Sequence, residues 1–535
     1  MALGLSTLIA GCGGGGNSVV QQPPTTYVLT VDSATPASGV AIAVSPADND
    51  KAANGTTTFA RSYNAGTAIT LTAPAKSGAN TFVSWAGCTS ASTVTCSVTL
   101  NGNTTVTANY SAAVASANTW YVSGTGSDSN NGQTPTTAFL TLQHAASLTQ
   151  PGDTVYAMNG AYTNTNPCCD VLDISIPGTP AHWITYKAYP GQTPILSFNG
   201  WEGIFFEPTA AYIEVSGFTI IGNNANVTLA EAMTQPTANP DPAYNGNCIS
   251  ADGRQGTATQ KPNHLKIMNN IISECGGAGI GTAESDYVTI AGNTIYNSAW
   301  YSLYGASAIS TWRNWNSDAN TGYKMFITGN TLYNNAELVP VAGVGLITDG
   351  EAIILDTLNN DYAGSTMSAY TGRTYVANNV IYANGSSAIE VFDSQHADIV
   401  NNSTHGNVLG PALNGKGELN LNEAGDVNVI NNIFYSASGQ NPVTSDPDCP
   451  ACILNYNLYY NGTNNPASMN GPDDLIADPL YITPAATDLS KVNLQVQPAS
   501  PAVGSGTSNL APSTDILGNP RPGAKGYDRG AYQQQ

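Results

Sequence analysis

Basic residues are scarce in this chain of 535 residues. It has 15 lysines and arginines against 36 aspartates and glutamates, which gives a formal net charge of −21. This excess of negative charge argues against nucleic acid or an anionic membrane surface as a partner. An acidic substrate would need cations or local basic side chains, although physiological salt screens the repulsion beyond about 8 Å.

Long apolar runs are missing as well. No stretch approaches the ~20 consecutive apolar residues of a transmembrane helix, so the sequence predicts none. Charged residues make up only 10% of the chain, and glycine is abundant with 54 copies. This balance is typical of repetitive extracellular β proteins rather than of helical cytosolic ones, and the length allows two or three domains.

The first twelve residues, MALGLSTLIAGC, are apolar and end in Cys12. They resemble a bacterial lipoprotein signal, in which that cysteine is lipidated, although the usual basic start is missing. The polar, glycine-rich residues 13–26 would then form a flexible tether. We therefore expect a lipoprotein of the outer membrane or cell surface, or a secreted protein, that touches a membrane only through a lipid anchor.

Eight further cysteines remain if Cys12 is lipidated, and an even number in an exported chain favours disulfides over metal ligation. Cys88 with Cys96 would close a hairpin. The pair in Cys449-Pro-Ala-Cys452 would close a short local loop. The sequence leaves open how the other four pair, namely Cys168, Cys169, Cys248 and Cys275.

A run of alternating apolar residues that ends in asparagine recurs along residues 246–460. The anchoring residues are Asn270, Asn293, Asn330, Asn379, Asn402, Asn432 and Asn457. Their numbers differ by 23, 37, 49, 23, 30 and 25, so a unit of about 23 residues recurs with insertions, as in a solenoid of stacked coils. We expect each asparagine to point inward and to bond its copy in the next coil, about 4.8 Å away.

A second alternating run precedes most of these anchors. One parity, which includes Ile249 and Leu419, must point inward, and the other, which includes Glu390 and Asn420, must point outward. Two or three short strands per coil predict a right-handed parallel β-helix over residues 118–535. The fold class is therefore all-β.

Residues 27–112 show short strand patterns separated by turns, which predict a small all-β module. The order of YNAGTAITLTAP, FVSWAGC, CSVTL and NTTVTANY resembles the bacterial surface repeat modules of the internalin B-repeat class. This resemblance implies spacing or binding at a cell surface and says nothing about chemistry.

The second domain opens at Trp120 with YVSGTGSDSNNGQTP and continues to PGDTVYAMNG. This opening resembles that of the right-handed β-helix polysaccharide lyases, which have the pectin-lyase-like fold. It implies a helix near 141–148 that caps the open strand edges. The closing SPAVGSG, DILGNPRP and YDRGAY resemble the end of the same group. Because this solenoid carries lyases, hydrolases, esterases, epimerases and adhesins, the resemblance implies a fold more than a reaction.

The outward side chains of the first strand in each coil form the densest polar strip of the predicted solenoid. Coiling places residues from separate coils in one groove, at steps of about 4.8 Å. Aromatic rings suit stacking on sugar rings, and the insertion at 358–375 would form one wall. The expected substrate-binding residues are Trp312, Arg313, Asn359, Tyr370, Asn420 and Glu423.

The preferred reaction is calcium-assisted β-elimination on a uronate-containing, acidic polysaccharide by a monomeric enzyme. Such a reaction needs a cation at the uronate carboxylate and a base. The strand EAIILD resembles the metal-binding E-I-I-x-x-K strand of chondroitinase-like and alginate-lyase-like β-helices, although acids stand where those families have bases. The expected calcium ligands are Glu351, Asp356, Glu390 and Asp393. The expected catalytic residues are Arg373, His396, Asp356, Glu390, Asp393 and Lys416.

Two alternatives stay open. The acids in place of bases favour a glycoside hydrolase that uses paired carboxylates on neighbouring coils. A non-catalytic adhesin that binds glycans is the other alternative.

Overall fold

The structure is a computed structural model that describes residues 24–78, 80–111, 117–164, 170–446, 449–461 and 471–535. The chain divides into two compact units, residues 1–115 and 116–535. The predicted signal with Cys12, most of the predicted tether and the pair Cys168 and Cys169 lie outside the described residues. In the part that the structure describes, no helix is long and apolar enough to cross a membrane.

The first unit is a small all-β module of two five-stranded sheets, ordered β4-β1-β10-β7-β6 and β3-β2-β5-β9-β8. Alternating residues of the two sheets, such as Leu29 and Leu71, fill the core between them. The predicted hairpin disulfide between Cys88 and Cys96 is confirmed. The strands are β1 (Thr26–Ala34), β2 (Ala41–Ser45), β3 (Gly55–Thr56), β4 (Phe59–Asn64), β5 (Ala68–Thr72), β6 (Lys76–Ser77), β7 (Asn80–Ala86), β8 (Ser90–Ser92), β9 (Thr95–Thr99) and β10 (Thr104–Ser111).

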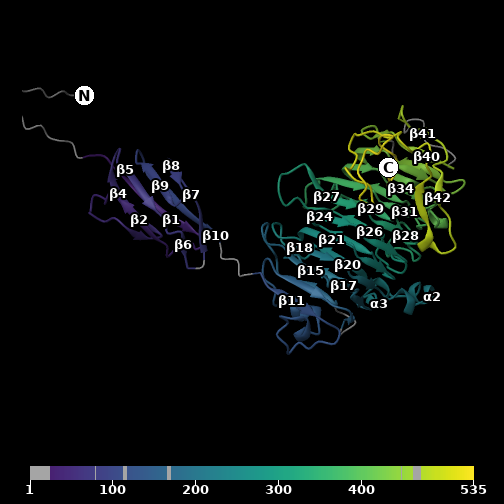
Figure 1. Cartoon of the computed structure of the whole chain (residues 1–535), viewed down its shortest axis with the longest axis horizontal. Coiled ribbons are helices and arrows are strands. Elements are labelled where there is room, and N and C mark those ends of the chain that lie inside the picture. The colour runs from purple at the N-terminus through teal and green to yellow at the C-terminus, as the bar shows by residue number, and fades with distance from the viewer. Residues whose placement is uncertain (1–23, 79, 112–116, 165–169, 447–448, 462–470) are drawn as a thin grey trace, which may run out of the picture. The chain divides into compact units, whose positions relative to one another are not determined.

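The second unit is a right-handed parallel β-helix, as predicted. Figure 1 shows its strands stacked coil on coil from β11 to β41. Each complete coil contributes one strand to each of three sheets, which we call sheets 1, 2 and 3 in the order in which the chain visits them. The nine strands of sheet 1 are β14 (Leu172–Ile174), β17 (Glu202–Phe206), β20 (Asn247–Asp252), β23 (Ile280–Ala283), β26 (Ile309–Trp312), β29 (Ile353–Asp356), β32 (Ile389–Phe392), β35 (Gly417–Asn422) and β38 (Asn441–Asp446).

Sheets 2 and 3 have eleven strands each. Sheet 2 contains β11 (Thr119–Val122), β12 (Thr154–Ala157), β15 (Ile184–Ala188), β18 (Ala211–Ser216), β21 (Asn263–Met268), β24 (Asp286–Ala291), β27 (Tyr323–Thr328), β30 (Arg373–Ala377), β33 (Gln395–Val400), β36 (Gly425–Ile430) and β39 (Ile453–Asn455). Sheet 3 contains β13 (Ala161–Thr163), β16 (Ile195–Ser197), β19 (Thr219–Ile221), β22 (Ile271–Ser273), β25 (Thr294–Tyr296), β28 (Thr331–Tyr333), β31 (Val380–Tyr382), β34 (Ser403–His405), β37 (Ile433–Tyr435), β40 (Leu458–Tyr460) and β41 (Leu475–Ile476).

Helices are few and short. The predicted cap is present as α1 (Leu142–Ala146), whose Thr141 hydroxyl accepts a hydrogen bond from the His144 N–H and whose apolar face is buried against the first coils. Two further helices, α2 (Leu229–Ala232) and α3 (Pro242–Asn245), lie in the insertion between β19 and β20. After sheet 3, the antiparallel pair β42 (Tyr481–Thr483) and β43 (Asn493–Val496) packs with the C-terminal residues on the outer side of that sheet.

The predicted asparagine ladder is present. The Asn293 Oδ1 accepts hydrogen bonds from both the backbone N–H and the Nδ2 of Asn270, each at 3.0 Å. The same pair of hydrogen bonds repeats from coil to coil up to Asn457. Because every buried amide is satisfied by its neighbour, the ladder fixes the register of the coils.

A second ladder runs parallel to the first, and the sequence analysis missed it. Asn335, Asn384 and Asn407 bond in the same way, and the carboxylate of Glu418 ends the row by accepting from the Asn407 N–H and Nδ2. The first three stand five residues after an asparagine of the first ladder, a spacing that the sequence contains.

The inward parity of sheet 1 is confirmed, whereas Glu390 and Asn420, which were predicted to point outward, are only 2% and 7% exposed. Ile249 and Leu419 are fully buried in the core, as predicted. Among the described cysteines, two further disulfides form, namely Cys449–Cys452, as expected, and Cys248–Cys275, which the sequence left open.

Candidate functional site

The register of sheet 1 aligns a row of outward side chains at the end of its strands. Trp312 pairs with Asp356, which pairs in turn with Phe392, then Asn422 and then Asp446. We call these five residues the outer row. Neighbouring strands are about 4.8 Å apart, so the row extends across four steps of the solenoid. Asp356 lies in its first half, which makes the row suitable for an extended ligand that crosses several coils.

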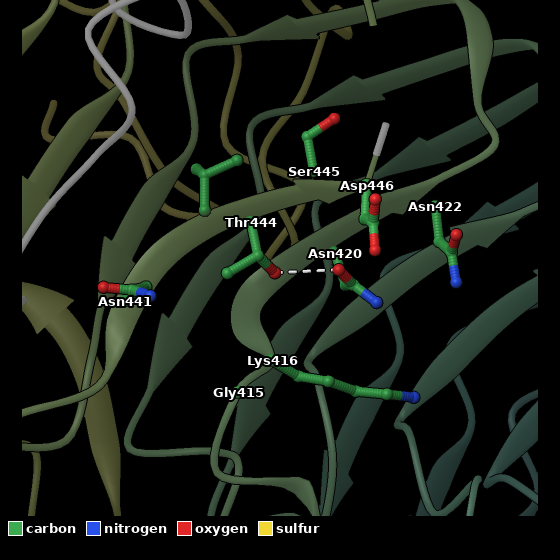
Figure 2. Close-up of a pocket in the computed structure, with 9 residues that line it drawn as sticks. Gly415, Lys416, Asn420, Asn422, Asn441, Thr444, Ser445 and Asp446 are labelled. Atoms are coloured by element: carbon green, nitrogen blue, oxygen red, sulfur yellow. Dashed lines mark hydrogen bonds between the residues drawn. The ribbon is translucent and has the colours of Figure 1, made fainter. Parts of the chain in front are cut away.

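A hollow lies at each side of Asp356 along this row. One has a volume of 540 Å³ and is lined by Lys416, Asn420, Asn422, Thr444 and Asp446, among others. Figure 2 shows Asn420 of β35 and Thr444 of β38 at the centre of this hollow, joined by a hydrogen bond of 2.8 Å from the Thr444 hydroxyl to the Asn420 Oδ1. All of these lining side chains can hydrogen-bond sugar hydroxyl groups.

The other hollow has a volume of 490 Å³ and is lined in part by Arg254, whose guanidinium carbon is 5.6 Å from the ring centroid of Trp312. Its lining includes Arg254, Lys261, Glu284, Trp315 and Tyr362. The Tyr362 residue belongs to the insertion between β29 and β30, so the predicted loop does form a wall of the groove.

Lys416 lies between two of the predicted calcium ligands. Its Nζ donates to the Glu351 Oε1 at 2.7 Å, to the Glu390 Oε2 at 2.6 Å and to the Thr348 carbonyl oxygen at 2.9 Å. The hydroxyls of Ser386 and Ser307 also donate to Glu351, at 2.5 and 2.7 Å. Two acids that the sequence predicted to gather around a cation therefore do so, but the cation is an ammonium group of the chain.

Burial decides the protonation of this cluster. The pKa of Glu390 is raised to about 9, chiefly by burial and also by the nearby Glu351 carboxylate, while Lys416 acts against the rise, so Glu390 is protonated at neutral pH. Burial also opposes the charged form of Glu351, but Lys416 and the hydroxyl donors outweigh it and lower its pKa. The pKa of Lys416 is raised despite burial, because both carboxyl groups favour its charged form.

The four predicted ligands do not fit calcium in this arrangement. Calcium takes six to eight oxygen ligands. The oxygens of Glu351 and Glu390 instead accept hydrogen bonds from Lys416, serine hydroxyls and Asn420. Among the residues that the structure describes, no three His, Cys, Asp or Glu side chains are grouped so as to hold a metal ion. Calcium binding stays a prediction that this geometry does not favour.

Asp356 is the partly exposed carboxyl of the outer row. Its pKa is raised to about 6, chiefly by burial and also by the neighbouring Glu351 carboxylate, while the Thr357 hydroxyl and Arg313 act against the rise. The Thr357 hydroxyl donates to its Oδ1 at 2.6 Å. Asp356 therefore exchanges its proton close to neutral pH, as an acid or base in catalysis must.

Asp393 directly follows the outer row on the next coil. Its pKa is raised, chiefly by burial and also by the carboxylates of Asp361 and Glu423, and the Asn359 Nδ2 donates to its Oδ1 at 2.6 Å. Asp356 and Asp393 interact electrostatically, since each coil adds one strand and their positions are neighbours. The predicted residue Asn359 thus positions a carboxylate, and the exposed Glu423 continues the same corner one coil further.

Arg313 lies at the same corner one coil before. Its guanidinium carbon is 3.9 Å from the ring centroid of Trp312 and 3.4 Å from that of Tyr362. The rings therefore hold it from both faces by cation–π contact.

Arg373 and His396 do not belong to this groove, contrary to the prediction. Both lie in sheet 2, where Arg373 binds Asp398 at 2.6 Å and Asp426 at 2.8 Å, and the His396 Nδ1 is 2.6 Å from the Asp426 Oδ2. Tyr323 also donates to Asp398. The charged groups of this cluster are paired with one another, so its residues connect neighbouring coils rather than bind a substrate.

Tyr370 is not a substrate-binding residue either. Only 2% of it is exposed, and its hydroxyl donates to the Asp286 Oδ1 at 2.7 Å, beside the buried ammonium of Lys324. The residue anchors the insertion to the solenoid. Glu390 and Glu351 are corrected in a similar way, because they are 2% and 0% exposed and reach the groove only through Lys416 and Asn420.

Sequence reasoning missed Tyr362 and Asp446. Asp446 could have been found by extending the outward parity of sheet 1 by one more strand, because it continues the row that contains Asp356. Tyr362 carried no signal, because the side of a loop that faces a groove does not follow a strand period.

Two family models match parts of the chain. Residues 48–114 match the model described as "Divergent InlB B-repeat domain", which confirms the resemblance seen in the first unit. Residues 149–352 match the model described as "Periplasmic copper-binding protein (NosD)". No curated protein matches the sequence. The described residues lack a His, Cys, Asp or Glu cluster for a metal, so they do not fit copper.

Several solved structures resemble the fold. A pectate lyase, Pel9A, is 12% identical, with a TM-score of 0.37 over 79% of this chain and 98% of its own. A rhamnogalacturonan lyase is 14% identical, with a TM-score of 0.37 over 73% and 97%. The lacto-N-biosidase of Eubacterium ramulus is 14% identical, with a TM-score of 0.37 over 68% and 67%. These likenesses are weak and say nothing about the reaction.

Proposed function

We propose that this protein is an exported enzyme that hydrolyses glycosidic bonds of a polysaccharide laid along the outer row. The observation that carries the proposal is the pair Asp356 and Asp393, two carboxyl groups with raised pKa values at the ends of paired strands on neighbouring coils. Glycoside hydrolysis uses two carboxyl groups, one to protonate the leaving oxygen and one to act as base or nucleophile.

In this proposal, Asp356 is the acid. Its proton is retained up to a pH of about 6 in the free enzyme, and Arg313 tunes that value. Asp393, oriented by the Asn359 amide, is the second carboxyl. Trp312 offers an aromatic surface to a sugar ring, and Asn420, Asn422 and Thr444 supply hydrogen-bonding groups on the far side of Asp356.

β-Elimination, the reaction preferred from the sequence, remains the second candidate. It is favoured by Lys416, whose ammonium group reaches the edge of the larger hollow and supplies a fixed positive charge for a uronate carboxylate without a metal. It is disfavoured because Lys416 stays charged and the other two basic residues predicted to be catalytic, Arg373 and His396, lie in the sheet 2 cluster.

Screening the full chain against a panel of acidic and neutral polysaccharides separates these functions. A hydrolase releases reducing ends without new ultraviolet absorbance. A lyase releases products whose unsaturated uronate absorbs in the ultraviolet. Retention on a polysaccharide without any product would instead support a glycan-binding adhesin and contradict the hydrolase.

Export rests on the three disulfides, because such bonds persist in oxidising compartments. Lipidation at Cys12 is a separate proposal. It is tested by labelling cells with a radioactive fatty acid, where the full chain should take up label and a Cys12→Ser variant should not. Equal labelling of both would contradict it.

A further inference from the structure

Arg313 forms no ion pair with any residue that the structure describes. Its Nε is buried with no hydrogen-bond partner. Within the described ranges, no acceptor binds its guanidinium and no carboxylate forms an ion pair with it, although Trp312 and Tyr362 cover both of its faces. Burying the Nε in this state is costly, since this donor has lost water without gaining an acceptor.

The other cations along sheet 1 are matched. Arg254 binds Asp252 through Nη2 at 2.5 Å, Lys261 binds Glu284 at 2.5 Å, and Lys416 binds two glutamates. Arg313 is therefore the unmatched positive charge among the described groove residues. The protein has a net charge of −21, so carboxylates are in excess over cations. The lack of an ion-pair partner at this described position is therefore a specific feature.

Geometry defines the ligand that this group would take. A guanidinium clamped on both faces can donate only along its edges, in the plane of its planar fork. That fork matches a pair of oxygens on one oxyanion, which a carboxylate or a sulfate ester provides. A neutral hydroxyl would leave most of the donors and all of the charge uncompensated.

We propose that Arg313 binds an anionic substituent, a carboxylate or a sulfate ester, on the sugar unit next to Asp356. The inference rests on the proposed function, because it names the class of polysaccharide that the groove selects. It makes Arg313 a specificity residue rather than a catalytic one, and it makes Tyr362 and Trp312 its positioning residues.

Binding of an anion would also act on Asp356. The charge of Arg313 favours the ionised form of Asp356 and so works against the burial that raises its pKa. An anion on Arg313 cancels that effect, so Asp356 would keep its proton to higher pH when the substrate is bound. The correct substrate would thus favour the protonated form that an acid catalyst needs.

The test compares wild type, Arg313→Gln and Arg313→Lys on three polymers: a uronan, the same polymer with its carboxyl groups reduced to alcohols, and a sulfated neutral glycan. Arg313→Gln should raise KM at least about tenfold on the anionic polymer that the wild type cleaves, and change KM less than about twofold on the reduced polymer. Arg313→Lys, which keeps the charge but loses the fork, should fall between them. The sulfated and carboxylated arms identify which oxyanion is bound.

Lys266→Gln is the matched control. Lys266 is also a cation on an aromatic ring, 4.4 Å from the centroid of Trp183, but it lies on β21 of sheet 2. This control removes the same charge and should leave KM unchanged on every polymer. Thermal melts of all variants check that the fold is kept.

Two results would overturn the inference: equal cleavage of the uronan and its reduced form by the wild type, or equal losses on both polymers in Arg313→Gln. If the wild type cleaves nothing, the proposed hydrolase fails, and electrophoresis through gels that contain the uronan or the sulfated glycan still tests Arg313. Slower migration of the wild type than of Arg313→Gln in either gel would keep the binding site. Equal migration in both would remove it.

Discussion

Arg313 and Arg373, which both lie near turns between sheets 1 and 2, have opposite surroundings. Arg373, at the start of sheet 2, is closed by Asp398 and Asp426. Arg313, at the end of a sheet 1 strand, has two aromatic rings and no carboxylate of its own among the described residues. A closed ion pair stabilises the protein, whereas an open cation is available to a ligand. The difference separates the structural corner from the functional one.

Replacing one acid at each corner should give the sharpest contrast. We expect Asp356→Asn to lower kcat by about 10²- to 10⁴-fold, because the amide cannot transfer a proton. Asp398→Asn should leave kcat within about twofold. Reducing-end assays at saturating polymer measure both. Full activity in Asp356→Asn would place the reaction elsewhere.

Stability should show the reverse order. Asp398 is 1% exposed and accepts from Arg373 and from the Asn428 Nδ2, so Asp398→Asn leaves a guanidinium poorly compensated and should cost about 3 kcal/mol of unfolding free energy. Despite burial, Arg373 and the other donors lower the pKa of Asp398 in the folded protein. Its contribution is therefore present above the unfolded pKa and is lost as pH falls through the lower, folded value.

Denaturant midpoints of wild type, Asp398→Asn and Arg313→Gln at neutral and acid pH measure this effect. The difference in denaturant midpoint between wild type and Asp398→Asn should become smaller at acid pH. Arg313→Gln should cost less than about 1 kcal/mol, since it breaks no ion pair. Equal losses in both variants would erase the contrast between the corners.

The pH profile should depend on the open corner. With a neutral polymer, kcat/KM should fall about tenfold per pH unit above a pH of about 6, because burial raises the pKa of Asp356 to about 6 and the acid must be protonated. In Arg313→Gln this limb should move to higher pH, since Arg313 no longer favours the carboxylate. Rates over a pH series would reveal it, and an unmoved limb would disconnect Arg313 from Asp356.

The smallest effect is expected from calcium. Because Lys416 supplies the positive charge between Glu351 and Glu390, chelation followed by calcium addition should leave activity and melting temperature unchanged. A rise in melting temperature with calcium would restore the metal site predicted from the sequence.

The sequence predicted the fold well because the fold repeats. The asparagine ladder and the inward parity of residues such as Ile249 and Leu419 follow from a period that can be read along the chain. Glu418 shares the outward parity of Asn420, yet it ends the second ladder and is 1% exposed. Its hydrogen bonds to Asn407 therefore decide its position more than the strand alternation does.

The site was predicted only in part, because it depends on corners and loops. Asp356, Asp393, Asn359, Trp312 and Arg313 do gather, since strand register governs them. Arg373 and His396 were misplaced because they follow sheet 1 strands along the chain yet belong to sheet 2. Their ion-pair partners are Asp398 and Asp426. These partners come from other coils, so they could not be identified from the sequence.

The asparagine ladder has a consequence for how such a chain can vary. Its anchors stay bonded whether 23 or 49 residues separate them. Additional residues between two anchors therefore form a loop at the side of the solenoid, while the spacing of the stacked coils stays the same. New contacts, such as the tyrosine that clamps Arg313, can be added or removed at the rim without disturbing the carboxyl groups beside them.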